Sequence, residues 1–224
     1  MKHRHSRGVS SVEFAFGMLV LLPLLLGTGV TGINMIRTLQ TVQLARDAGH
    51  MYARGVDFSQ PGNQTILVNL GSNLGLSATS GQGTAVVILS ALTYVDKNAC
   101  AAVGAVDGSG NPTSACTNYT KWVFTQRLEI GNDSVRSSNY GSPLTSGPTG
   151  VTISATTGQI TQQQYVTRAG AVANFTGVNP YEVVNGTAEG LPSGQLLYVA
   201  EAGSTGFNMP PFVSNAVSYS WGLF

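Results

Sequence analysis

Side chains able to act as a general base are scarce in this chain. The histidines are His3, His5 and His50, so none lies beyond residue 50. A histidine-dependent nucleophilic site in the rest of the chain would lack its base. The Walker A, HExxH and GxSxG motifs are also absent from the sequence. We therefore expect no enzyme activity and no cofactor.

The distribution of charge excludes a nucleic-acid partner. The net charge is +1, but residues 55 to 224 carry five basic and eight acidic side chains, which leaves no basic surface for a phosphate backbone. Three acidic residues of this region, Glu182, Glu189 and Glu201, are too far apart in sequence to suggest a catalytic pair. We expect them to be solvated at the surface.

The two cysteines, Cys100 and Cys116, bracket a segment rich in Gly, Ala, Ser and Asn. Two cysteines without a nearby histidine pair cannot complete a zinc site, so no metal is expected. In an oxidising compartment such as the periplasm they should form a disulfide. Closing a loop of about 15 residues would stabilise the fold by roughly 3 kcal/mol on the chain-entropy estimate.

Glu13 is a carboxylate at the edge of an apolar segment. From Phe14 to Ile36 there is no Asp, Glu, Lys or Arg, and a helix of that length can cross the ~30 Å hydrocarbon layer of a bilayer. A charge at the centre of a bilayer costs roughly 2.5 kcal/mol or more. Glu13 therefore either pairs with a cation or snorkels to water as an interfacial glutamate.

The residues before the apolar segment indicate its orientation. Lys2, Arg4 and Arg7 form a basic head, and such residues tend to stay in the cytoplasm, which places the chain beyond about residue 40 outside. A cleaved secretory signal peptide begins in the same way. However, this apolar run exceeds the usual ~7–15 residues, and no small-x-small cleavage site closes it.

The run Gly8-Val9-Ser10-Ser11-Val12-Glu13-Phe14 resembles the leader of type IV prepilins, in the short form found in the tight-adherence (Flp) pilus system. The resemblance implies that a prepilin peptidase cuts between Gly8 and Val9, which makes Glu13 the fifth residue of the mature chain. The new α-amine of Val9 would supply a cation for Glu13 of the same or a neighbouring subunit. Methylation of Val9 stays open.

The helix is predicted to continue beyond the span, from about Ser10 to Arg54. Leu39, Val42, Ala45, Ala48 and Tyr52 recur at helical spacing, with polar residues on the other side. Together with SSVEFAF, the stretch TLQTVQLARDAGHMYAR resembles the TadE-like family of minor pilins or pseudopilins. That family implies, as partners, a prepilin peptidase, other pilin subunits and an inner-membrane assembly platform.

Pro23 lies inside the predicted span, where it removes a backbone hydrogen bond and should bend or loosen the helix. Gly27, Gly29 and Gly32 follow it. These small residues either allow a second helix to approach closely or are simply tolerated, as glycines often are in membrane helices.

The remainder of the chain is predicted to be β-rich, which gives an α+β protein with a mainly antiparallel sheet. We divide the whole chain into a leader (1–8), a transmembrane and amphipathic helix (9–55) and an extracytoplasmic domain (56–224). Residues 132–150 should be an exposed loop, and 151–160 an edge strand or a loop. Clearer strands, rich in β-branched and aromatic residues, are predicted at 84–95, 121–130, 195–202 and 212–221. The first two should form a hairpin with the disulfide across its base.

Two functions are compatible with these features. The first is a minor pilin or pseudopilin, held in the bacterial inner membrane by one span with its domain in the periplasm, and then assembled into a pilus or secretion filament. The second is a membrane-tethered binding protein or adhesin that enters no filament. The place of the protein at the tip, in the shaft or in the assembly platform is left open by the sequence.

Overall fold

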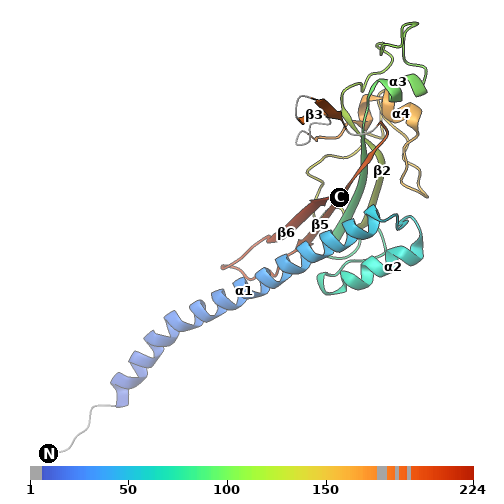
Figure 1. Cartoon of the computed structure of the whole chain (residues 1–224). Coiled ribbons are helices and arrows are strands. Elements are labelled where there is room, and N and C mark those ends of the chain that lie inside the picture. The colour runs from blue at the N-terminus through green and yellow to red at the C-terminus, as the bar shows by residue number, and fades with distance from the viewer. Residues whose placement is uncertain (1–6, 176–180, 185–186, 191–192) are drawn as a thin grey trace, which may run out of the picture.

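The computed structural model describes residues 7–175, 181–184, 187–190 and 193–224, and one long helix dominates it (Figure 1). Helix α1 spans Arg7–Ala53, 47 residues, which corresponds to about 70 Å. The predicted continuous helix is confirmed. Residues 1–6, which hold most of the basic head, lie outside the described residues.

Four antiparallel strands form the main sheet, in the order β2-β1-β5-β6. The predicted combination of a long apolar helix with an antiparallel sheet is confirmed. The first two strands pair with each other as a hairpin, with one irregularity between Ala91 and Leu92. The strands are β1 (Ala85–Tyr94), β2 (Trp122–Gly131), β5 (Leu196–Thr205) and β6 (Val217–Leu223).

The last strand begins later than the sequence predicted. We expected a strand over 212–221, but the residues before Val217 form a loop. The N–H groups of Phe212 and Val213 donate to the carbonyl of Met209 at 2.9 and 3.0 Å, so they close a turn instead of joining a ladder. The two prolines before them lack an N–H and could not extend the strand.

Several short elements were not predicted. None of the helices among them exceeds ten residues, so apolar periodicity is too brief to mark them. Local signals do exist, because Pro61 starts one helix and the Asp96 carboxylate caps another by accepting from the Ala99 N–H at 2.8 Å. These elements are α2 (Pro61–Leu70), η1 (Ser72–Leu74), α3 (Lys97–Ala102), α4 (Gln162–Thr167), η2 (Ala169–Ala171) and the paired strands β3 (Tyr181–Val184) and β4 (Thr187–Gly190).

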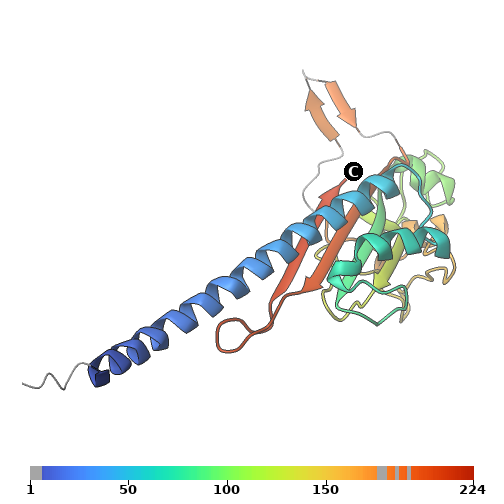
Figure 2. The ribbon, with the colours of Figure 1, turned by 90° about the horizontal axis from the view of Figure 1, so that it is seen from below.

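The second half of α1 packs along β5 and β6 (Figure 2). Thr41 bonds Ser204 at 2.8 Å within this contact. Leu39 was expected on the buried stripe but is 63% exposed, because it lies about 120° around the helix from Ala45. The core on this face of the sheet contains Leu44, Ala45, Ala48, Tyr52, Phe58, Val87, Leu89, Ala91, Ile130, Ala200 and Ala202.

A second core lies at the end of the sheet where β2 begins, and the segment after residue 150 completes it. Residues 151–160 form a loop, one of the two predicted alternatives, and pair with the sheet through isolated bridges such as Gln126 to Gln159. The ring of Trp122 meets that of Phe175 edge to face, with centroids 5.3 Å apart. Other members are Leu92, Val95, Cys100, Cys116, Phe124, Val151, Val166 and Val199.

Candidate functional site

The residues of the predicted processing and assembly site lie at the start of α1. Gly8 and Val9 fall in its first turns, and the Glu13 and Phe14 side chains are exposed. Apolar side chains up to Leu26 are exposed as well. In the described part of the chain, α1 is the one helix long and apolar enough to cross a membrane. Such an exposed apolar surface needs lipid or protein around it, and Glu13 is the carboxylate that this environment would enclose.

The proline and glycines of the predicted span do not interrupt α1. The helix is continuous through Pro23, since neighbouring hydrogen bonds hold the turn that the missing N–H weakens. Gly29 has open space where a side chain would stand. A side-chain carbon on Gly27 would lie 3.5 Å from Cδ1 of Phe212, which is an ordinary contact. Neither glycine is therefore required for packing within one molecule.

The predicted disulfide between Cys100 and Cys116 is present, with Cα atoms 5.6 Å apart. Cys100 belongs to α3, and Cys116 lies in the chain that returns to β2. The bond therefore ties a short helix to the return segment and does not join the two strands across the base of their hairpin. Helix α3 lies at the end of the domain farthest from the start of α1 (Figure 1). The disulfide thus has no part in the N-terminal site.

A buried ionic network, missed at the sequence level, lies on the sheet face opposite α1. Glu201 was expected at the surface but is 0% exposed. Its Oε2 accepts from Ser138 Oγ at 2.5 Å, and its Oε1 accepts from the Asn139 N–H at 2.9 Å and from the Tyr219 hydroxyl. Arg127 Nη1 is 3.8 Å from Oε2. The carboxylate is therefore matched by hydrogen-bond donors and one cation.

The alternation of β5 explains how Glu201 becomes buried. Ala200 and Ala202 face α1, so the residue between them points to the opposite face. The predicted loop 132–150 is irregular as expected, but part of it crosses that face and supplies Ser138 and Asn139. The one sequence signal for the burial of Glu201 was its position between two alanines in a predicted strand.

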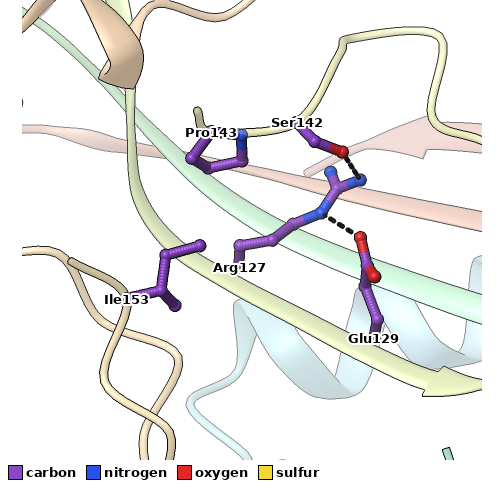
Figure 3. A pocket seen from close by; sticks show the side chains of 5 residues that line it. All are labelled: Arg127, Glu129, Ser142, Pro143 and Ile153. Atoms are coloured by element: carbon purple, nitrogen blue, oxygen red, sulfur yellow. Dashed lines mark hydrogen bonds and ion pairs between the residues drawn. The ribbon is translucent and has the colours of Figure 1, made fainter. Parts of the chain in front are cut away.

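Arg127 is the cation of the network and is fully engaged by protein groups. Nε binds Glu129 at 3.0 Å, Nη1 binds Ser90 at 2.8 Å and Nη2 binds Ser142 at 3.3 Å. Figure 3 shows the Glu129 and Ser142 bonds at the edge of a hollow of about 290 Å³, which Pro143 and Ile153 also line. Because the guanidinium already has these partners, the arrangement holds the loop to the sheet and does not present a free cation.

The tyrosines beside Glu201 are held in their neutral form. Burial, followed by the Glu201 carboxylate, raises the pKa of Tyr140 to about 12. Burial and the hydrogen bond to Glu201 raise the pKa of Tyr219 above its usual range. Arg136 stacks over the Tyr219 ring with its guanidinium carbon 4.6 Å from the centroid. Both phenols therefore stay neutral at physiological pH, and Tyr219 donates its hydroxyl hydrogen to Glu201.

Within the residues that the structure describes, no group of three or more His, Cys, Asp or Glu side chains is placed to hold a metal ion. Comparisons with protein-family models, curated proteins and solved structures give no match. Two features stand out, the exposed apolar half of α1 with Glu13 and the buried network around Glu201.

Proposed function

We propose that this protein is a minor pilin or pseudopilin of a tight-adherence (Flp-type) pilus or secretion filament. A prepilin peptidase would process it, and it would then assemble through α1. The observation that carries the proposal is the division of α1 into two halves. The first half is apolar, exposed and marked by Glu13, while the second is built into the core of the domain. A subunit of this shape can leave a bilayer and enter a helical bundle without unfolding its domain.

The role of Glu13 follows from cleavage after Gly8. Cleavage would release the α-amine of Val9 four residues before Glu13, which is about one helical turn along the same face. In a filament, the amine of one subunit and the carboxylate of its neighbour could neutralise each other in apolar surroundings. Loss of one member of a buried ion pair costs on the order of 3–5 kcal/mol, which is enough to exclude a subunit from assembly.

The first test is the mature N-terminus. Protein extracted from the membranes of its native host should begin at Val9 by intact mass and N-terminal sequencing, and a bulky residue at Gly8 should abolish the cut. A chain that begins at Met1, or beyond residue 30, would contradict the proposal. The protein would then be better described as a membrane-tethered binding protein.

The second arm separates assembly from anchoring. Glu13→Ala and Glu13→Gln should reach the membrane at normal levels, because removal of a charge from the edge of a span only favours insertion. Both should lose cross-links to other pilus components. Asp47→Asn is the matched control, since Asp47 is an exposed carboxylate on the domain half of the same helix. Undiminished cross-linking of both Glu13 variants would refute the assembly role.

A further inference from the structure

The loop between β5 and β6, residues 206–216, reaches beyond the sheet and lies beside the apolar part of α1. Figure 1 shows it near the middle of the helix, and contacts with Asn34 and Gly27 join it to α1. Asn34 fixes one end of the loop, because its Nδ2 donates to the Phe207 carbonyl at 3.2 Å and its Oδ1 accepts from the Phe207 N–H at 2.7 Å. Closer to the N-terminus of α1 than Asn34, Gly27 contacts the Phe212 ring of the loop.

The position of these contacts along α1 decides what surrounds the loop. About 20 residues of helix cross a ~30 Å hydrocarbon layer, so a span that begins at Phe14 ends near Ile33. Gly27 then lies about 9 Å inside the hydrocarbon at 1.5 Å per residue. A loop in contact with Gly27 cannot stay in water if α1 spans the membrane.

The composition of the loop suits such an environment. Residues 202–224 contain no Asp, Glu, Lys or Arg. Phe207 and Phe212 are exposed, at 37% and 39%, although aromatic side chains of this kind are normally packed in a core. Their exposure in one loop, continuous with the exposed apolar face of α1, indicates a single surface with one type of partner.

The backbone hydrogen bonding of the loop also suits a medium without water. Every unpaired N–H or C=O costs several kcal/mol in hydrocarbon, and Pro210 and Pro211 at the turn carry no N–H. Six other N–H groups donate within the loop or to Asn34, those of Gly206, Phe207, Met209, Phe212, Val213 and Ala216. The cost of entering lipid is lowered accordingly.

We propose that the β5–β6 loop inserts into the bilayer leaflet on the side of the domain, where lipid acyl chains cover Phe212 and Phe207 lies at the boundary between the acyl chains and the head groups. The inference rests on the proposed span of α1. The loop would be a second membrane-embedded element beside the helix and would set the depth and tilt of the domain above the membrane. A second protein chain is not needed to cover it, because the span itself brings the loop to this level.

The test is a depth measurement on the full chain in phosphatidylcholine vesicles. Both native cysteines are in the disulfide, so a spin label can be placed on single new cysteines. Leu22→Cys reports the middle of the span, and Ser109→Cys reports water at the far end of the domain. Phe212→Cys and Phe207→Cys report the loop. Accessibility to apolar oxygen and to a water-soluble nickel chelate is compared at each position.

The expected order of depth is Leu22, then Phe212, then Phe207, with Ser109 in water. Phe212 should show a several-fold higher ratio of oxygen to nickel accessibility than Ser109. Phe207 should give an intermediate value, since Asn34 holds it seven residues, about 10 Å, closer to the surface than Gly27.

Three results would overturn the inference, and they differ from one another. Nickel accessibility at Phe212 equal to that at Ser109, with Leu22 in lipid, would refute loop insertion and leave the span intact. Low accessibility of Phe212 to both reagents would mean that protein covers it, as in contact with a second copy. Water at Leu22 would refute the span itself, and the loop proposal would fail with it.

Discussion

Replacement of Glu201 by glutamine tests whether the buried network stabilises the domain. The substitution keeps the shape of the side chain but removes its charge and exchanges one acceptor oxygen for an NH₂ group. Three donors, from Ser138, Asn139 and Tyr219, converge on the two carboxylate oxygens. At least one of them would therefore lose its acceptor, and Arg127 would lose a buried counter-ion.

The magnitude follows from the burial of the pair. Glu201 is 0% exposed and Arg127 is 5% exposed, so water cannot replace the lost charge. Breaking such a pair costs about 3–5 kcal/mol. For a chain of this size, each kcal/mol lowers the Tm by about 2–4 °C, so Glu201→Gln should melt at least about 6 °C below the parent.

The assay is urea and thermal unfolding of the full chain in detergent, followed by the fluorescence of Trp122 and Trp221. Glu129→Gln is the matched control, because Glu129 also binds Arg127 but its side chain is 37% exposed, and pairs exposed to solvent contribute only about 0–1 kcal/mol. The double variant with Arg127→Met should lose at least about 1 kcal/mol less than the sum of the single variants. Equal losses in Glu201→Gln and Glu129→Gln would refute the reasoning.

Three other outcomes are expected. Reduction of the Cys100–Cys116 disulfide should lower the free energy of unfolding by about 3 kcal/mol. Calorimetry with and without reductant would measure this loss, and an unchanged value would mean that the loop is rigid without the bond. Because the pKa of Tyr140 is raised to about 12, its stabilising contribution is complete below pH 10 and is lost between about pH 10 and 12; alkaline unfolding of Tyr140→Phe should show a smaller loss over that range. Gly158→Ala should cost about 1–3 kcal/mol in chemical denaturation, since φ is +68° and the new carbon would lie 2.4 Å from a backbone oxygen, whereas Gly108→Ala, in open space, should be near neutral.

Much of the α+β fold could be predicted because its signals are local. The uncharged run after Glu13 and the helical spacing of Ala45, Ala48 and Tyr52 lie within one continuous helix. Strands β1 and β2 are dense in β-branched and aromatic residues, so their type and hairpin pairing were predicted correctly. Short helices such as α2 escaped prediction because fewer than three turns carry too little periodicity.

The sequence by itself determined where the long helix lies, which strands form the sheet, and which residues, from Gly8 to Phe14, are candidates for processing and assembly. Only the tertiary structure decided that Glu201 is buried beneath the 132–150 loop, with Ser138 separated from it by 63 residues. It also decided that the β5–β6 loop lies beside the apolar half of α1, through bonds between Asn34 and Phe207, 173 residues apart. Local periodicity records which face of an element is apolar, whereas what covers that face depends on contacts between distant segments, and these exist only once the chain has folded.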